Sequence, residues 1–178
     1  MSILHRGQTL QEGPPHEIMA HPANRAVARL VDLKNIFQAR IAEQRAGADI
    51  TRLEWGSTIL GAGFNSGFAV GDPVDWVIPP GSVILHRRRK PSRGVRENPV
   101  HGRVESMVRL GDTVSIAITL DELARHPLFM SMPVHAAERN SIRPGEQVGV
   151  SLMSGDIHIM PALQSDESDE SDDASADM

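Results

Sequence analysis

The sequence predicts a mainly β protein in which two short helices precede one or more small β-barrels. Short runs of apolar and β-branched residues, separated by Gly, Asp and Pro, follow Asn35 and continue to about residue 160. In the run 113–120, Thr113 and Ser115 alternate with apolar residues at the two-residue period of a half-buried strand. Residues 14–34 instead carry apolar residues at helical spacing. The change of period at Asn35 therefore separates a helical segment from β structure.

We expect both helices in the N-terminal segment. Pro15 suits a first helical turn, and Pro22 ends that segment. Asn24 is a suitable N-cap for a second helix. That helix would bury three apolar residues at i, i+3 and i+4 spacing, which are Val27, Leu30 and Val31. We therefore assign residues 1–35 to a helical N-terminal region.

The β runs fall into two blocks, 36–86 and 98–162, with a basic linker at 87–97 between them. In the first block, strands are predicted at 36–42, 50–55, 58–60 and 74–78. In the second block, strands are predicted at 102–109, 113–120, 128–135, 147–153 and 157–160. Gly155-Asp156 predicts a hairpin turn between the last two runs. Short strands at this spacing favour a small barrel that is closed or nearly closed.

The charge of the chain is concentrated at its end. The 178 residues carry a net charge of −5, and residues 165–178 contain seven acids and no base. Such a segment has almost no apolar side chains to offset the entropy of ordering it. We therefore expect a disordered acidic tail at 163–178, with a partner-binding tail as the alternative.

Composition also limits the cellular setting. The chain has no cysteine, which excludes disulfides and thiolate metal sites and fits a reducing compartment. No apolar run approaches the roughly 20 residues that span a bilayer, and residues 1–13 have no signal-peptide pattern. We expect a cytoplasmic protein without direct membrane insertion, whose membrane association goes through a partner.

A nucleotide-hydrolysing site is not expected. A P-loop needs a lysine that directly follows a glycine loop and reaches the β and γ phosphates. The chain has two lysines, Lys34 after Leu33 and Lys90 after Arg89, and neither has that setting. The run 116–122 superficially resembles a strand that ends in ATPase carboxylates, but its alternating polar residues suit a strand with one wet face. We therefore predict no enzyme activity, no catalytic residue and no cofactor.

Two further site classes are disfavoured. His16 and His21 lie five residues apart, which places them roughly 140° apart around a helix, so they cannot share a metal. The remaining histidines are scattered without metal-ligand spacing. The basic cluster 86–93 invites a nucleic-acid hypothesis, but the chain has four Phe, two Trp and no Tyr for bases to stack on. We interpret the cluster as a solvated linker and expect neither a metal nor a nucleic acid.

The N-terminal region resembles a known family. The sequence GQTLQEGPPHEI (7–18), followed by HPAN (21–24), VA (27–28) and then Asn35, closely resembles the end of the nucleotide-binding domain in ABC importer ATPases. The similar importers are of the molybdate, sulfate, iron, polyamine and sugar type. In these proteins the segment leads into a transport-associated OB (TOBE) domain.

The second block is similar to that TOBE domain. NPVHGRV (98–104) resembles its entry strand, IRPGEQV (142–148) its turn, and IHIM (157–160) its closing strand. VIPPGSV (77–83) resembles a further element, although Pro and Gly replace the family's Arg and Glu. The resemblance covers most of residues 3–162 and implies an OB-like fold.

The resemblance implies a non-catalytic accessory or regulatory module that acts in solute import through protein–protein contacts. The glycine loop, signature motif and catalytic carboxylate of the family would lie upstream of Met1. The implied partners are an ATPase and a permease, at the inner face of the cell membrane, with a homodimer formed by packed barrels. Residues 3–34 would lack the nucleotide-binding core, so their apolar side chains must find the barrels, a second chain or water.

The alternative is a freestanding oxyanion-binding protein of the molybdate/tungstate type, which the second block also resembles. The candidate oxyanion or interface residues are Arg96, Asn98, Gly102 and Ser154. The family's lysine is replaced by Met153, and Glu97 adds a carboxylate beside the site. An anion site that lacks its cation loses its main electrostatic attraction. A vestigial product of an interrupted gene is a third interpretation, and the sequence does not identify a transported solute.

Overall fold

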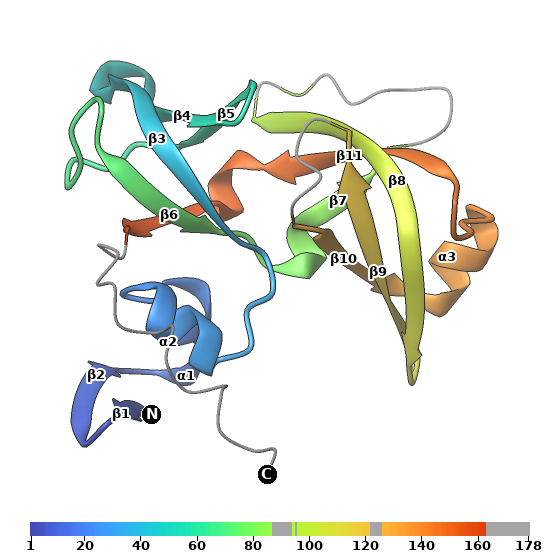
Figure 1. The fold of residues 1–178 in the computed structure, drawn as a ribbon, viewed down its shortest axis with the longest axis horizontal. Coiled ribbons are helices and arrows are strands. Elements are labelled where there is room, and N and C mark those ends of the chain that lie inside the picture. Colours follow the sequence, from blue (N-terminus) through green and yellow to red (C-terminus); the bar gives the residue numbers. More distant parts are fainter. Residues whose placement is uncertain (87–93, 95, 122–125, 163–178) are drawn as a thin grey trace, which may run out of the picture.

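The computed structural model describes residues 1–86, 94, 96–121 and 126–162, and these form two curled antiparallel sheets with a small N-terminal segment beside them (Figure 1). The strands of the first sheet are β3 (Ile36–Arg45), β4 (Ile50–Trp55), β5 (Thr58–Gly63), β6 (Pro73–Val77) and β12 (His158–Pro161). Those of the second sheet are β7 (Val83–Leu85), β8 (Glu97–Leu110), β9 (Thr113–Leu120), β10 (Leu128–Pro133) and β11 (Gln147–Met153). The orders are β12-β6-β3-β4-β5 and β10-β9-β8-β11-β7. In each sheet the edge strands approach each other, which gives two nearly closed barrels and confirms the mainly β prediction.

Each predicted strand is recovered, several with shifted bounds, including the start of β8, which begins at Glu97 where the prediction was 102, and the end of β10. The sequence predicted a strand over 128–135, whereas β10 ends at Pro133 and helix α3 (Val134–Arg139) begins there. Pro133 suits this change because it lies just before the helix and its ring favours the backbone angle of a helix start. The sequence analysis also missed β7, which has only three residues.

The N-terminal region contains the two predicted helices and a hairpin that was not predicted. The helices are α1 (Pro15–Ala20) and α2 (Arg25–Leu30), and the Asn24 side chain accepts a hydrogen bond from the Val27 backbone N–H at 3.0 Å. The hairpin consists of β1 (Ser2–His5) and β2 (Gln8–Glu12). Arg6 and Gly7 both have positive φ, as a two-residue hairpin turn requires. The description of residues 1–35 as helical was therefore incomplete.

The two sheets exchange their last strands. β7 follows the strands of the first sheet in sequence but pairs with β11 in the second, and β12 follows β11 but pairs with β6 in the first (Figure 1). The prediction of a hairpin at Gly155-Asp156 was therefore wrong. Ser154–Asp156 forms a 3-10 turn instead, which carries the chain from one sheet to the other. Pro80–Ser82 forms the matching turn before β7.

This exchange reflects an internal repeat. Read from the exchanged strand inward, the orders β12-β6-β3-β4-β5 and β7-β11-β8-β9-β10 are the same. The sequence NIFQARI at 35–41 lies at the start of β3, and NPVHGRV at 98–104 occupies the same place in β8. Both strands shift register just after this motif, at Ile41/Glu43 and at Val104/Ser106. The repeated motif is the sequence signal from which the duplication could have been predicted.

Hydrogen bonds at equivalent turns support the repeat. The Gly71 N–H donates to the Ile41 carbonyl at 2.8 Å, and the Gly145 N–H donates to the Val104 carbonyl at 2.7 Å. Both glycines have a positive φ, a backbone conformation that residues with a side chain rarely adopt. The same turn therefore closes the same end of each barrel.

Two equivalent asparagines join the halves. The Asn35 side chain donates to the Phe129 carbonyl at 2.8 Å and accepts from the Phe129 N–H at 2.7 Å. The Asn98 side chain makes the same pair with Gly61, at 2.8 and 2.7 Å. Each asparagine thus satisfies the backbone of a strand in the opposite half. Buried apolar residues of both halves form one continuous core around these contacts.

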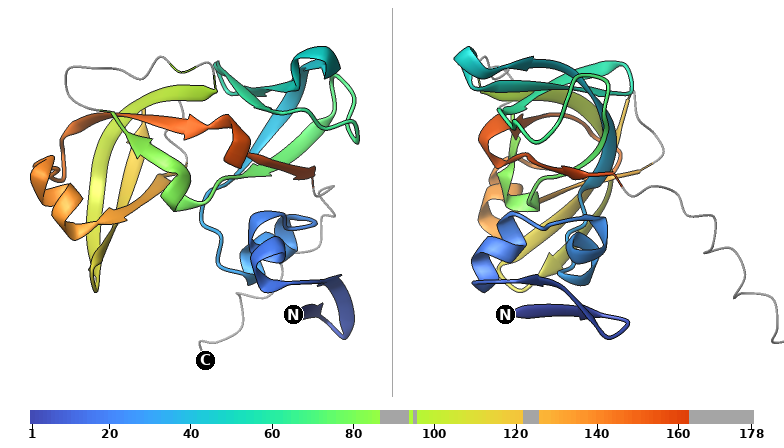
Figure 2. Two further views of the ribbon diagram at one scale, coloured as in Figure 1. Left: turned by 180° about the vertical axis from the view of Figure 1, so that it is seen from behind. Right: turned by 90° about the vertical axis from the view of Figure 1, so that its left-hand side faces the viewer.

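The N-terminal helices pack on the first half of the repeat. Ala28 of α2 contacts Val77 and Met160, and the Arg25 guanidinium forms a two-point ion pair with Asp75, whose Nε–Oδ2 distance is 2.9 Å. The hairpin lies on the side of the helices that faces away from the sheets (Figure 2). The helices therefore dock within their own chain.

This docking answers, in part, where the apolar residues of the helices go. Ile18 and Val27 are buried, whereas Leu30 is 50% exposed and Val31 is half-buried. Of the three alternatives expected for these side chains, which are the barrels, a second chain or water, Ile18 and Val27 are covered by their own chain. Leu30 remains half exposed.

Candidate functional site

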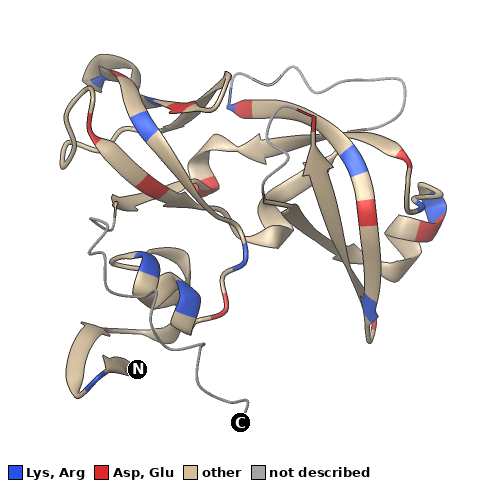
Figure 3. Ribbon diagram, viewed as in Figure 1, with Lys and Arg blue, Asp and Glu red and all other residues tan. Residues whose placement is uncertain are grey.

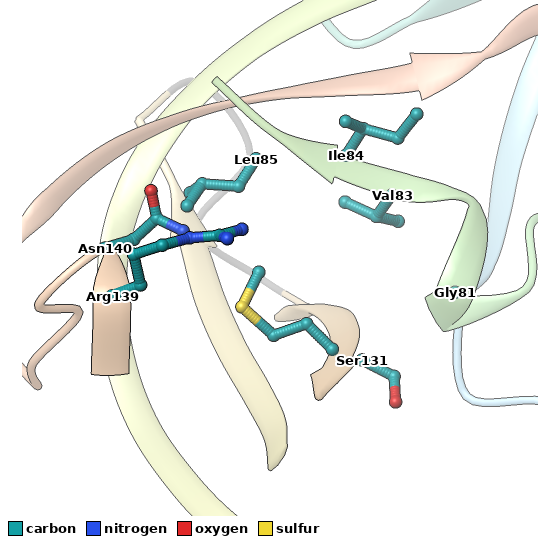
Figure 4. A pocket seen from close by; sticks show the side chains of 8 residues that line it. Gly81, Val83, Ile84, Leu85, Ser131, Arg139 and Asn140 are labelled. Atoms are coloured by element: carbon teal, nitrogen blue, oxygen red, sulfur yellow. The ribbon is translucent and has the colours of Figure 1, made fainter. Parts of the chain in front are cut away.

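A pocket opens between the two edge strands of the second half. β7 and β10 approach without pairing, and α3 lies at one end of the gap (Figure 4). Its volume is about 640 Å³. Its residues come from β7, from β10, from α3 and its C-cap, and from the turn before β7. The pocket lies here because the exchanged strand β7 forms one edge of the second sheet and faces the other edge strand, β10, without pairing with it.

The pocket combines an apolar wall with a polar end. Val83, Leu85 and Met132 supply apolar surface, and Ser131 supplies a hydroxyl. The guanidinium of Arg139 extends from α3 toward Leu85 (Figure 4), and it forms no ion pair with any residue that the structure describes. This chemistry suits a ligand that has an apolar part and an anionic group.

The four residues singled out from the sequence do not line this pocket. Asn98 is only 9% exposed, and its amide nitrogen also donates to the Leu152 carbonyl at 3.1 Å, in addition to its pair with Gly61. Its side chain is therefore engaged in joining the halves. Arg96 is exposed, and its carbonyl accepts from the Ser154 N–H at 3.0 Å, which brings these two residues together.

Gly102 has a packing role. A Cβ built at this position would overlap the Thr119 carbonyl oxygen and lie 2.9 Å from the Ile118 side chain. Glycine therefore allows β8 to lie close to β9 within the barrel. At the equivalent position in the first half, Ala39 is only partly buried.

A polar cluster that the sequence analysis did not predict lies on the face of β8 and β11. The His86 ring nitrogen Nε2 is 2.7 Å from the Ser151 hydroxyl, and that hydroxyl donates to Glu97 at 3.1 Å. The His101 ring is 6.3 Å from that of His86. Burial, and secondly the charge of His101, lower the pKa of His86, while Glu97 acts in the opposite direction. No spacing in the sequence reveals this cluster, because strand pairing brings its members together.

A second perturbed histidine lies at the contact between helices and sheet. His158 Nε2 is 3.0 Å from the Pro22 carbonyl, and the His158 ring makes an edge-on contact with His21. Burial lowers the pKa of His158, the hydrogen bond to Pro22 raises it, and the charge of His21 lowers it further. The imidazole is therefore neutral near pH 7 and ties the α1–α2 loop to β12.

Three other expectations concern charge, metals and membranes. In the described ranges, no three His, Cys, Asp or Glu residues gather to hold a metal ion. No helix among the described residues is long and apolar enough to cross a bilayer. Basic and acidic residues are interspersed over the described elements (Figure 3). Residues 87–93 of the basic cluster, and the tail predicted at 163–178, lie outside the described residues.

Residues 80–160 match the family model of the TOBE domain. The spermidine/putrescine import ATP-binding protein PotA of Oleidesulfovibrio alaskensis is 28% identical over 162 residues, which cover 86% of this chain and 41% of that protein. PotA of Acetivibrio thermocellus is 27% identical over 165 residues, covering 91% of this chain and 40% of that protein. PotA of Nitratidesulfovibrio vulgaris is 29% identical over 163 residues, covering 89% and 42%. The chain thus spans about two fifths of the length of these curated relatives.

A solved structure has the same fold. The cytoplasmic molybdate-binding protein ModG, in a form with molybdate bound, superposes with a TM-score of 0.64. The match covers 73% of this chain and 97% of that one at 15% sequence identity. At this identity the likeness concerns the fold alone, and it confirms the predicted OB-like architecture.

Proposed function

Given a TOBE domain at residues 80–160 and a chain that resembles the C-terminal region of importer ATP-binding subunits, we propose that this protein is a non-catalytic module of an ABC importer. It acts in solute import through contacts with an ATP-binding domain and a permease at the inner face of the membrane. The polyamine importers of its curated relatives suggest the class of transporter, but the solute is left open.

The observation that carries this proposal is the N-terminal segment. Residues 1–35 are not part of the TOBE match, yet they are fixed to the first half of the barrel through Arg25 and Asp75. The same segment leaves three large apolar side chains at least half exposed, and these are Leu4, Met19 and Leu30. Apolar side chains on an anchored segment form a suitable surface for a partner protein. In the proposed complex, that partner is the nucleotide-binding domain.

Co-purification tests this proposal. The chain is expressed with an importer ATP-binding subunit and permease from the same genome, and the triple variant Leu4→Asp/Met19→Asp/Leu30→Asp is compared with the unchanged chain. We expect the unchanged chain to be retained with these subunits and the variant to be lost. Val70→Asp is the matched control, since Val70 is 63% exposed and lies in the loop between β5 and β6. Retention of the triple variant, or no retention of the unchanged chain, would contradict the proposal.

Oxyanion binding is a second candidate function. It is favoured by the superposition on a molybdate-binding protein over nearly all of that protein's length, and by the Arg139 guanidinium at the pocket, which has no ion-pair partner among the described residues. It is weakened by the internal hydrogen bonds that occupy Asn98. Isothermal titration with molybdate, tungstate and sulfate separates the candidates. Micromolar binding that Arg139→Gln abolishes would favour this function over the first.

A further inference from the structure

Gly149 lies in the middle of three neighbouring strand segments. Gly149 pairs with His101 on β8, and on its other side its carbonyl accepts from the His86 N–H at 2.8 Å. A Cβ at Gly149 would lie 2.8 Å from His86 Nδ1 and 3.4 Å from His101 Nε2. One nitrogen of each imidazole thus lies near the same point. The missing side chain leaves room for a small ligand between them.

The hydrogen bonds that link His86 to Ser151 and Glu97 determine which imidazole nitrogen has a free lone pair. A carboxylate can only accept, so the Ser151 hydroxyl gives its single hydrogen to Glu97. The Ser151 oxygen is then left to accept from His86, which places the imidazole hydrogen on Nε2. Nδ1 therefore carries the lone pair, and it is this nitrogen that lies near the gap above Gly149. A carboxylate that orients an imidazole in this way is typical of the outer shell of a metal site.

The two imidazoles are accessible to a ligand. His101 is exposed and His86 is half-buried, so the gap is open to solvent. The point over Gly149 lies 2.8 Å from His86 Nδ1 and 3.4 Å from His101 Nε2, so both rings must turn toward an ion to reach a coordinate bond of about 2.0–2.1 Å.

The geometry points to a binding site for a divalent transition-metal ion, held by His86 Nδ1 and His101 Nε2 over Gly149. Imidazole ligands suit Zn²⁺, Ni²⁺ and Cu²⁺. Since no third protein ligand gathers here among the residues described, water completes the coordination. The site is accessible to solvent, so the bound ion can exchange. It is separate from both the pocket and the exposed apolar residues Leu4, Met19 and Leu30 of the N-terminal segment.

The first half of the repeat shows why this site occurs once. Asp75 is the equivalent of Gly149, and its neighbours across the strands are Gln38 and Met160. There a carboxylate fills the position and holds Arg25. Gln and Met replace the two imidazoles, so the equivalent place is closed and lacks the nitrogen ligands.

Metal titration of the full chain tests the inference. Isothermal titration with Zn²⁺ and Ni²⁺ at neutral pH, and electron paramagnetic resonance with Cu²⁺, measure affinity and the number of nitrogen ligands. We expect saturable binding with two nitrogen ligands. His86→Ala and His101→Ala each remove it, and Ser151→Ala weakens it by about 10-fold or more, as loss of an outer-shell partner does. The exposed position of His101 makes its variant the one that keeps the fold.

The matched control is the double variant His16→Ala/His21→Ala, which removes two exposed histidines elsewhere. It is expected to bind as the unchanged chain does. Gly149→Ala is a second arm, because its methyl would occupy the gap and should weaken binding without removing a ligand. Absence of saturable binding would overturn the inference. Binding that survives in His101→Ala but is lost in the control would assign the metal to other residues and overturn it equally.

Discussion

The two halves of the repeat share one strand order, but their equivalent outer faces differ in what covers them. In the first half, α2 covers β6 and β12 through the Arg25–Asp75 ion pair and the contact of Ala28 with Val77. In the second half, the positions of Asp75 and Val77 are taken by Gly149 and Ser151, and no described helix covers them. A few side chains therefore decide whether this face binds a segment of its own chain or stays open.

The features that recur in both halves are those that the barrel structure requires, whereas the other features differ. The paired asparagines, the glycine turns and the register shifts recur in both halves, because each satisfies backbone groups or sets the curvature of the sheet. The outer faces meet no such constraint. They are free to acquire different roles, which here are helix docking and the His86–His101 pair.

The largest effect is expected from Arg25→Ala. The Asp75 side chain is fully buried, and removal of its cation leaves a buried charge that has lost an ion-pair partner. We expect a loss of about 3 kcal/mol in the free energy of unfolding. Hydrogen exchange should show residues 15–30 losing protection, while the second half stays protected. Arg29→Ala, on an exposed position of the same helix, is the control and should change little.

Asn35→Ala and Asn98→Ala test whether the two joining contacts are equivalent. Each variant leaves a backbone N–H and carbonyl of the other half without their partner. We expect each to cost about 2 kcal/mol in denaturant unfolding. A variant that is tolerated while its counterpart is not would show that the halves do not depend on each other symmetrically.

Gly102→Ala and Ala39→Gly test one position where the halves differ. A methyl at Gly102 must displace the β9 backbone, so a loss of about 1–2 kcal/mol is expected. The reverse change at Ala39, whose methyl packs against the core, costs about 0.5–1 kcal/mol, because glycine in a strand adds conformational entropy to the unfolded chain. Thermal unfolding of both variants gives the comparison. Equal losses would contradict the packing role assigned to Gly102.

The smallest effect concerns pH and the helix contact. Because the pKa of His158 in the folded chain lies below the ordinary 6.5, the unfolded chain binds more protons as pH falls through 6.5. The stability that neutral His158 gives the folded chain is therefore fully present above pH 6.5 and is lost as the pH falls below it. His158→Gln should flatten the fall in stability between pH 7 and 5.5. His135→Gln, an exposed change on α3, should leave the slope as it was.

Much of the local structure could be predicted from the sequence, because strands and helix caps depend on residues that are close together in the chain. Strands β4, β9 and β11 were predicted with their observed bounds, and Asn24 was identified as a cap. The alternation of 113–120 and the glycine turns needed no tertiary information. The pocket and the histidine pair were not predictable in this way, since their residues come from strands far apart in the chain.

By itself, then, the sequence determined a mainly β chain with two N-terminal helices and a resemblance to importer ATP-binding subunits. Periodicity and turn residues report which face of a strand is buried and where it ends. Only the tertiary structure decided that β7 and β12 change places, because a strand at a sheet edge is chosen by the partner that pairs with it. It likewise decided that His86 lies beside His101, because strand register, which depends on the whole sheet, sets that neighbourhood.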